Sequence, residues 1–215
     1  MAPYRLHCFP QSGNSYKIAL YLTCAGLDWN PVLVNFFGGE TRTPHWRAAV
    51  NEMGEVPVLE VDGRKLTQSG AILTYLAETT GHFAPATAEQ RQETLRWMLY
   101  DNYRFTNYFA TRRFLKCFAP DAPDPAVLAF FKGRADAALG VVDTHLAATP
   151  FMLGAEPTIA DFSLIGYMYF PFEETGYDLA QSFPNVFAWT ERMKTLPGWK
   201  HPYDLIPGPR VKPLR

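Results

Sequence analysis

The sequence has no long apolar run, no excess of one charge and few cysteines. No segment approaches the roughly 20 apolar residues that a membrane-spanning helix needs, and the opening MAPYRLHCFPQSG has no apolar stretch of signal-peptide length. With 20 basic and 21 acidic residues the net charge is -1, which gives no electrostatic reason to expect nucleic acid or an anionic membrane as a partner. We therefore expect a cytoplasmic protein that acts on a small molecule or on another protein.

The three cysteines, Cys8, Cys24 and Cys117, form no CxxC pair and stand among apolar residues. An odd number without paired spacing predicts neither a disulfide framework nor a zinc site, so we expect no bound metal. What the sequence does have is 47% apolar and 15% aromatic residues in 215. That is enough to fill one large core or two small ones.

Residues 1–81 predict the element order βαβαββα. Short strands are expected at 4–9 and 30–36, with a helix between them that ends near Gly26. The segment VPVLEVDGRKLTQ predicts two strands joined at Asp62-Gly63, because Asp-Gly between alternating apolar residues favours a tight hairpin. Ser69 then opens an amphipathic helix.

Residues 82–87 have little periodicity and predict a linker, and residues 88–215 predict an all-helical domain. Helix-like spacing runs through 88–117, and PDAPDP marks a break before another helix. Further on, Thr158 and Asp161 have the spacing of a capping box, with Pro157 and Phe162 in the two positions of a hydrophobic staple. We expect a structural role for Asp161 and no part in catalysis.

Five segments, taken in order, resemble the signature segments of the cytosolic glutathione transferases. They are SGNSYKIALYL, GETRTPHW, NEMGEVPVLEVDG, LTQSGAILTYLAE and TIADFSLIGY. The chain is similar to bacterial members with a serine-type active site, theta-, zeta- or beta-like, and the resemblance covers nearly its whole length. It implies a thioredoxin-like N-terminal domain, an all-α C-terminal domain, glutathione as co-substrate and a two-fold homodimer.

Two dipeptides are candidates for binding glutathione. The resemblance implies a cis bond at Val56-Pro57; the backbone of Val56 would then pair with the cysteinyl group as an added strand does. Gln68-Ser69 precedes a helix, and the N–H groups and positive dipole end of a helix start suit the α-carboxylate of a γ-glutamyl group. Alone, Ser69 reads equally well as an N-cap.

The loop before the first helix is the candidate for activating the thiol. A free thiol has a pKa near 8.5, so a hydroxyl at a helix start is needed to stabilise the thiolate. Ser12 aligns with the catalytic serine of the family, whereas Asn14 stands where zeta-like members have a cysteine. Asn14 and Ser15 stay as alternative donors. Cys8 lies on a predicted strand, which disfavours a covalent mixed disulfide.

Glu55 departs from the family pattern at the glycine end of glutathione. Many relatives have Lys, Arg or Gln before the Val-Pro pair, and a glutamate there would repel a carboxylate unless it points away. A compensating positive charge is therefore expected. We choose Arg42, with His45 and Lys17 as alternatives.

Aromatic and basic residues on 88–117 form a stripe that would line a cleft between domains. The members proposed to contact a hydrophobic electrophile are Tyr103, Tyr108 and Arg112. An aromatic stripe on a helix is more often part of a core or of a dimer interface than of a substrate site, and Arg112 is alternatively an anchor of a helix end. The expected reaction is attack of the glutathione thiolate on a small hydrophobic electrophile. The alternatives are glutathione-dependent isomerisation or peroxide reduction, and a non-catalytic binding module.

Overall fold

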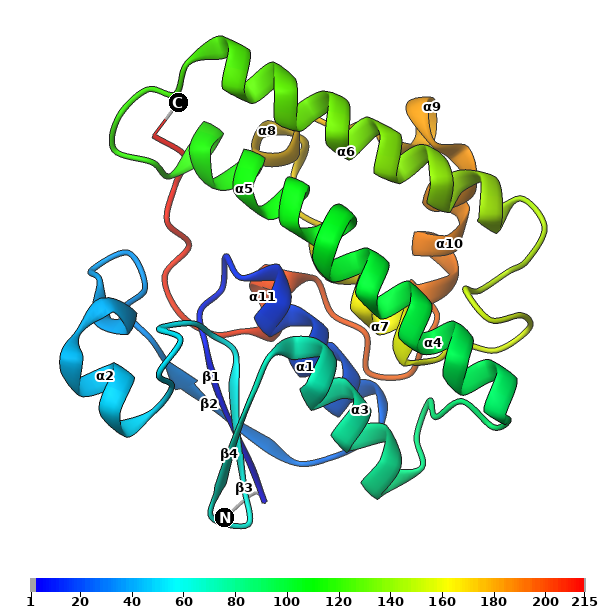
Figure 1. Ribbon diagram of the computed structural model, residues 1–215, viewed down its shortest axis with the longest axis horizontal. Coiled ribbons are helices and arrows are strands. Elements are labelled where there is room, and N and C mark those ends of the chain that lie inside the picture. Colours follow the sequence, from blue (N-terminus) through cyan, green and yellow to red (C-terminus); the bar gives the residue numbers. More distant parts are fainter. Residues whose placement is uncertain (1–2, 215) are drawn as a thin grey trace. The chain divides into compact units, whose positions relative to one another are not determined.

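The computed structural model describes residues 3–214, which divide into two compact units (Figure 1). The first unit contains the chain up to Ala84 together with Leu196–Arg210, and the second contains Pro85–Thr195 and the residues from Val211. We describe each unit by itself.

The first unit is a four-stranded sheet with helices, in the predicted order βαβαββα. Its elements are β1 (Tyr4–Cys8), α1 (Gly13–Cys24), β2 (Trp29–Leu33), η1 (Glu40–Arg42), α2 (Pro44–Ala49), β3 (Val58–Val61), β4 (Arg64–Thr67), α3 (Ser69–Thr80) and α11 (Pro202–Leu205). The strand order is β2-β1-β3-β4, with β2 parallel to β1 and the other pairs antiparallel. Pro31 lies in β2, an edge strand, where its missing N–H does least harm. The thioredoxin-like prediction is confirmed.

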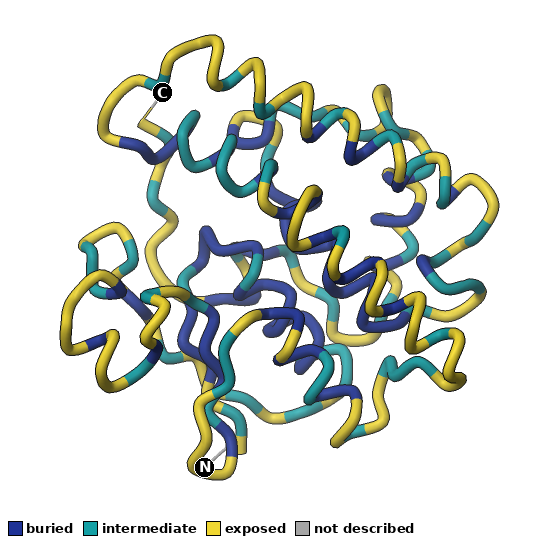
Figure 2. The backbone as a smooth tube through the Cα atoms, in the orientation of Figure 1, coloured by how far each residue is buried: buried dark blue, intermediate teal, exposed yellow. Residues whose placement is uncertain are grey.

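The core of this unit lies where β1 and β3 meet α1 and α3 (Figure 2). Leu6 and Leu59 are cross-strand partners and are fully buried, as are Ile18 of α1 and Ile72 of α3. Each such side chain contributes about 1.5–3 kcal/mol when it leaves water. This burial packs α1 and α3 against the sheet, and the candidate site lies at the starts of these two helices.

The segment Leu196–Arg210 belongs to the first unit, whereas the sequence predicts an all-helical domain over residues 88–215. The Tyr16 hydroxyl donates to the Lys200 carbonyl at 2.9 Å. Gly198 has φ 79°, and a Cβ there would stand 2.9 Å from the Thr23 carbonyl oxygen at the end of α1. Glycine is therefore required where this segment crosses α1.

The second unit is helical. Its elements are α4 (Ala88–Tyr100), η2 (Asp101–Phe105), α5 (Thr106–Cys117), α6 (Pro125–Leu146), α7 (Ile159–Leu164), η3 (Ile165–Tyr167), α8 (Phe172–Thr175), α9 (Leu179–Ser182) and α10 (Pro184–Lys194). These elements confirm the predicted helical C-terminal part. Within the described part of the chain, no helix has the length and apolar character needed to cross a membrane.

A π-helical turn, η2, interrupts the stretch that the sequence predicts as one helix over 88–117. Asp101 begins this turn and is fully buried; its carboxylate accepts the hydroxyls of Thr106 at 2.6 Å and Ser163 at 2.7 Å. A π turn changes the number of residues per turn. The side-chain stripe expected from α-helical spacing therefore does not run unbroken through Asp101–Phe105.

The capping box at the start of α7 is present as predicted. The Thr158 side chain caps the helix, and the Asp161 carboxylate accepts the N–H of Thr158 at 2.9 Å. The same carboxylate accepts the Met152 N–H and the Trp189 Nε1–H, both at 2.9 Å. Burial raises the pKa of Asp161, and these donors oppose that rise. All of its contacts serve the helical unit, which fits the structural role expected for Asp161.

Candidate functional site

Ser12 is the N-cap of α1. Its backbone is extended, and its Oγ accepts the Ser15 N–H at 3.0 Å, as a capping serine does. No acidic residue stands in the first turn of α1, so its positive end is not neutralised there. Ser12 is 5% exposed. A hydroxyl that accepts the helix N–H keeps its own hydrogen for an anion at this helix start.

The two alternative donors have different surroundings. Ser15 is fully buried, and its Oγ has no hydrogen-bond partner among the described residues. Asn14 is half-buried, and its Oδ1 faces the Ser69 hydroxyl at 3.4 Å, a long and weak hydrogen bond. Asn14 therefore connects the start of α1 to the start of α3.

Gln68 and Ser69 form the start of α3. Gln68 has φ 65° and ψ 112°, a combination that a residue with a Cβ adopts at a cost of about 1–3 kcal/mol. Such conformations persist where the surroundings enforce them, most often at binding sites. Like α1, α3 has no acidic residue in its first turn. Two uncompensated helix N-termini thus lie side by side, joined through Ser69 and Asn14.

The Val56-Pro57 bond is cis, as the resemblance implied. Pro57 is buried and Val56 half-buried. Among the residues 3–214, none pairs with the backbone N–H or C=O of Val56. This peptide directly precedes β3 and has the free main-chain groups that an added strand needs.

The loop before Val56 is shaped by Asn51, which the sequence analysis did not single out. Asn51 is 4% exposed; its Nδ2 donates to the Glu55 carbonyl at 3.0 Å and its Oδ1 accepts the Met53 N–H at 3.0 Å. An asparagine followed three positions later by a glycine is a turn signal, and this spacing of Asn51 and Gly54 is the sequence signal that could have identified Asn51. Asn51 fixes the direction in which Glu55 leaves the loop.

Glu55 points toward Gln68. The Gln68 Nε2 donates to the Glu55 carboxylate at 2.9 Å and contacts the Met53 sulfur at 3.2 Å. Both side chains are exposed. Glu55, which the sequence suggests would repel a carboxylate, is thus hydrogen-bonded to Gln68, a residue predicted to bind the γ-glutamyl group.

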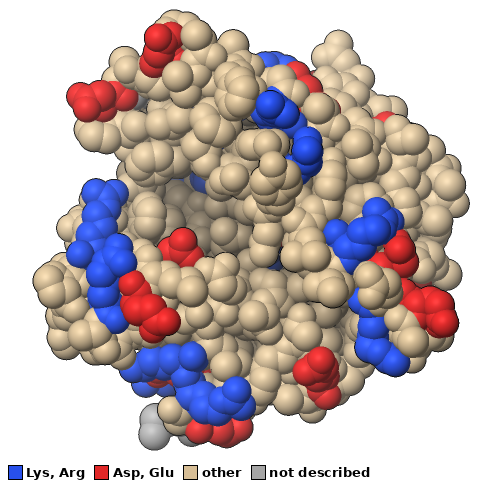
Figure 3. Space-filling view, viewed as in Figure 1, with Lys and Arg blue, Asp and Glu red and all other residues tan. Residues whose placement is uncertain are grey.

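Arg42, the predicted compensating charge, is exposed at the end of η1. Arg47 of α2 contacts the loop before Val56, because its Nη1 donates to the Glu52 carbonyl at 2.8 Å. A Cβ on Gly54, which has φ 71°, would stand 2.6 Å from the Arg47 Nη2. Figure 3 shows basic and acidic side chains gathered over the region of α2. Arg47 is a basic residue that the sequence analysis missed.

The alternatives to Arg42 are placed differently. His45 is exposed on α2, whereas Lys17 is fully buried in α1. Cys8 is also fully buried, and burial raises the pKa of its thiol to about 12. Almost no thiolate would form on Cys8 at neutral pH, which disfavours a covalent disulfide mechanism further.

The end of the first unit's C-terminal segment braces the loop that carries Ser12. The Gln11 Nε2 donates to the Pro209 carbonyl at 3.2 Å. Gly208 has φ 124°, and a Cβ there would meet the Pro10 ring at 3.3 Å. The end of this segment therefore lies against both residues before Ser12.

The residues expected to hold an electrophile do not form one cluster. Tyr103 lies in η2 and is 67% exposed, whereas Tyr108 packs on Phe131 of α6 at 6.3 Å between ring centroids. Arg112 donates to the Thr175 carbonyl at the end of α8 and lies 5.6 Å from the Tyr177 ring. These contacts support the alternative that Arg112 anchors a helix end.

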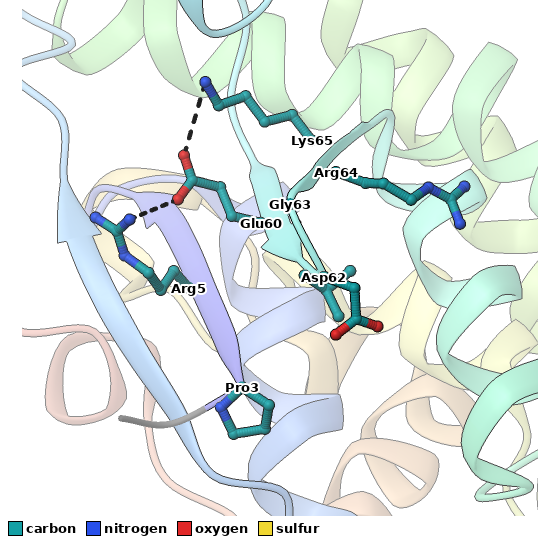
Figure 4. Close-up of a pocket in the computed structure, with 8 residues that line it drawn as sticks. Pro3, Arg5, Glu60, Asp62, Gly63, Arg64 and Lys65 are labelled. Carbon is teal, nitrogen blue, oxygen red and sulfur yellow. Dashed lines mark hydrogen bonds and ion pairs between the residues drawn. The ribbon is translucent and has the colours of Figure 1, made fainter.

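A hollow of about 310 Å³ lies beside β1 and the β3–β4 hairpin (Figure 4). Its charges largely pair with one another: the Glu60 carboxylate lies 2.8 Å from Arg5 and 3.9 Å from Lys65. None of the predicted site residues lines it. Among residues 3–214 there is also no group of three or more His, Cys, Asp or Glu side chains suited to a metal ion.

Family models match both parts of the chain. Residues 2–78 match the model described as glutathione S-transferase, N-terminal domain, and residues 125–192 match glutathione S-transferase, C-terminal domain. The candidate site residues of the first unit all fall within the first match.

Individual relatives cover most of the chain. Glutathione S-transferase F14 of Arabidopsis thaliana is 32% identical over 205 residues, which span 91% of this chain and 80% of that protein. Maleylacetoacetate isomerase of Rhizobium meliloti (strain 1021) is 33% identical over 172 residues, spanning 76% and 79%. The crystal structure of a glutathione S-transferase from Pseudomonas fluorescens superposes with a TM-score of 0.83 at 32% identity, covering 93% of this chain and 98% of that one.

Proposed function

We propose that this chain, which belongs to the glutathione S-transferase family, binds glutathione and transfers its thiolate to a small hydrophobic electrophile. The observation that carries the proposal is the pairing of two helix N-termini, with Ser12 capping α1 and Ser69 opening α3 next to Asn14. One end suits a thiolate and the other a carboxylate, and glutathione carries both groups.

In this proposal the tripeptide lies along the Val56 backbone. The N–H and C=O of Val56 pair with the cysteinyl residue, and the N–H groups at the start of α3 with the Ser69 hydroxyl hold the γ-glutamyl α-carboxylate. The cysteinyl sulfur then reaches the start of α1. Arg42 or Arg47 supplies the charge for the glycine carboxylate.

Ser12 is the proposed thiol-activating residue. Its hydroxyl hydrogen, oriented by the Ser15 N–H on its oxygen, donates to the sulfur, and the end of the α1 dipole adds to the effect. Each unit by which the thiol pKa falls corresponds to about 1.4 kcal/mol of thiolate stabilisation. The electrophile is then attacked by a thiolate held in place, so proximity supplies much of the rate.

The helical unit is the proposed source of electrophile contacts, with Tyr103 and Tyr108 as candidates. Arg112 is assigned a structural role because it contacts the Thr175 carbonyl and the Tyr177 ring.

A homodimer is also proposed. Leu95 and Leu99, one turn apart on α4, are 51% and 60% exposed and are residues that a second copy would cover. Light scattering tests the dimer.

The test of the proposed function begins with calorimetric titration of glutathione, followed by conjugation to 1-chloro-2,4-dinitrobenzene. We expect a single glutathione site per chain and conjugation at a rate above the uncatalysed reaction. Binding without turnover of any electrophile would favour a non-catalytic module. Absence of glutathione binding would overturn the proposal.

A second candidate is glutathione-dependent isomerisation, favoured by the 33% identity to maleylacetoacetate isomerase. Against it, Asn14 stands where zeta-like members have a cysteine. Assaying maleylacetoacetate isomerisation and peroxide reduction on the same preparation separates these reactions from conjugation.

A further inference from the structure

One face of the sheet in the first unit is covered by α2 at one end only. Leu6 and Cys8 of β1 are fully buried on one face, so Arg5 and His7, which alternate with them, point to the other face. The His7 ring packs edge-on against Trp46 of α2, at 5.7 Å between ring centroids. Arg5 lies two residues beyond this contact and is exposed.

Three charged residues form a row across the open part of this face. Arg5 of β1 is the cross-strand partner of Glu60 of β3, and Glu60 is the partner of Lys65 of β4. Directly opposite residues have their side chains on the same side of a sheet. The row lines the hollow of about 310 Å³ beside the β3–β4 hairpin (Figure 4). Small-molecule sites occupy about 300–1,000 Å³, so the hollow has room for a small ligand.

The carboxylate of Glu60 is already engaged by the protein. Its Oε2 accepts the Arg5 Nη1–H at 2.8 Å, whereas its Oε1 pairs with the His7 Nε2 at 2.9 Å and lies 3.9 Å from the Lys65 Nζ. Two side chains with a fixed positive charge therefore share one negative charge. The row as a whole is positive.

Arg5 and Lys65 also keep hydrogen-bond donors for a ligand. A guanidinium has five N–H groups, an ammonium has three, and neither accepts a hydrogen bond. Among the described residues, Glu60 is the polar partner of the Arg5 guanidinium, and the Lys65 ammonium has only the Ala49 carbonyl, at 2.6 Å, besides Glu60. The Arg5 and Lys65 side chains are 54% and 40% exposed, so an anion from solvent can reach both.

The other charged residues of the hairpin lie outside this row. Arg64 also borders the hollow, but it pairs with Val61 across the hairpin, and its guanidinium lies 5.4 Å from the Tyr75 ring of α3. The Asp62 carboxylate points away from Glu60 (Figure 4). Arg64 is thus a basic residue of the same hairpin whose side chain is turned to the opposite face of the sheet.

We propose that Arg5 and Lys65 bind the phosphate group of a small phosphorylated molecule in this hollow. The Nε and Nη2 edge of the Arg5 guanidinium matches two phosphate oxygens, and Lys65 adds a compact charge. A phosphate monoester carries about 1.5 to 2 negative charges at neutral pH, more than a carboxylate, and so gains more from two cations. Glu60 is a positioning residue, since it holds the Arg5 Nη1.

This site is distinct from the proposed glutathione site. None of the residues proposed to bind glutathione or to activate its thiol lines the hollow. The inference therefore goes beyond the proposed function and stands or falls independently of it.

The experiment titrates inorganic phosphate, and then glycerol 3-phosphate, into the full chain while sodium chloride keeps the ionic strength constant. Two-dimensional NMR follows the backbone amides of residues 60–65 and the side-chain Nε–H of Arg5. We expect saturable shifts at these positions with a Kd of about 1–10 mM for phosphate, because exposed charged contacts contribute modestly. Glycerol 3-phosphate should bind at least as tightly, and sodium chloride alone should give no saturable shift.

Variants separate the row from the general charge of the hairpin. Arg5→Gln should raise the Kd for phosphate about fivefold to tenfold, and Arg5→Lys should restore only part of the affinity because it lacks the planar fork. Lys65→Gln should raise the Kd about threefold to fivefold. Arg64→Gln is the matched control, since it removes the same charge from outside the row, and its Kd should stay within about twofold. Thermal melts check that each variant is folded.

Four results would overturn the inference. They are shifts that never saturate, binding of inorganic phosphate without glycerol 3-phosphate, an equal loss of affinity in Arg64→Gln and Arg5→Gln, and displacement of phosphate by glutathione. The third would mean that only the general positive charge attracts the anion, and the fourth that the anion occupies the glutathione site. Failure of the chain to bind glutathione would overturn the proposed function and leave this inference standing.

Discussion

The Oγ of Ser12 accepts the N–H of Ser15 at 3.0 Å, so the hydroxyl proposed to activate the thiol is also the cap of α1. Capping uses a lone pair of the oxygen and leaves the hydrogen for the ligand. Stability and thiol activation are therefore coupled at one atom, and substitutions at Ser12 must be chosen to separate them.

Ser12→Ala should remove both roles. Loss of the cap lowers the free energy of unfolding by about 1 kcal/mol. Loss of the donor raises the pKa of bound glutathione, and the conjugation rate at neutral pH should fall about tenfold to a hundredfold. The ultraviolet thiolate band that appears on adding glutathione, followed against pH, measures the pKa directly.

Two controls interpret that result. Ser12→Thr keeps a hydroxyl that caps and donates, so it should restore most of the band. Ser15→Ala removes a buried hydroxyl that has no partner among the described residues, and should leave stability unchanged or raise it by up to about 1 kcal/mol. If Ser15→Ala abolishes the thiolate band and Ser12→Ala does not, the assignment of Ser12 is wrong.

Asp161→Ala should destabilise the helical unit strongly without touching glutathione binding. Its removal leaves the N–H groups of Met152, Thr158 and the Trp189 ring buried without an acceptor. We expect a loss of about 3–5 kcal/mol in chemical denaturation. Asp161→Asn keeps one acceptor oxygen and should lose less. A glutathione Kd that changes in a variant still folded at low temperature would argue against a purely structural role.

Much of the local structure in both units could be predicted because the signals are local. Asp62-Gly63 requires only its own turn, and Ser69 and Thr158 mark helix starts within a few residues of sequence. The cis bond at Val56-Pro57 followed from the resemblance and from the presence of a proline. Such features depend little on distant parts of the chain.

The features that the sequence did not reveal depend on distant partners. The π turn at Asp101 is accompanied by a buried carboxylate whose partner Ser163 is 62 residues away. Gln11 and Pro209 are 198 residues apart. The direction of Glu55 depends on Asn51 and Gln68 together. The sequence shows only the negative charge of Glu55, which by itself suggests repulsion of the glycine carboxylate of the ligand.

Glu60→Gln should weaken stability at neutral pH and not in acid. Burial raises the pKa of Glu60, but the hydrogen bond from His7 and the charges of Arg5 and Lys65 outweigh it, so the pKa lies below its ordinary value. A carboxyl with a lowered folded pKa stabilises the fold above its unfolded pKa, about 4.3, and loses that contribution as pH falls through the folded pKa.

The measurement is the free energy of unfolding of both proteins across pH. The difference between them should stay below about 1 kcal/mol because solvent screens these side chains, and it should shrink as the pH falls below about 4. A difference that grows on acidification would contradict the sign of the pKa change.

Gln11→Ala should loosen the loop that carries Ser12. Without its amide, the donor to the Pro209 carbonyl is lost, which costs about 0.5–1.5 kcal/mol. We expect a small rise in the pKa of bound glutathione, since Ser12 is held less firmly. Gln11→Glu has the same shape but no N–H, and should behave like the alanine variant. A Gln11→Glu variant indistinguishable from the unmodified protein would show that this brace is unimportant.

Arg42 and Arg47 can be separated by their effect on the glycine end of the ligand. Arg47 is held against the Val56 loop by the Glu52 carbonyl and lies over Gly54, whereas Arg42 stands exposed at the end of η1. We therefore expect Arg47→Gln to raise the Kd for glutathione about threefold to tenfold and to lose most of this effect with γ-glutamyl-cysteine-ethyl amide, which lacks the glycine carboxylate. Arg42→Gln, the matched control, removes the same charge from the neighbouring segment. The reverse order of effects would restore Arg42 as the compensating charge, and equal losses with both ligands would mean that Arg47 acts by holding the loop.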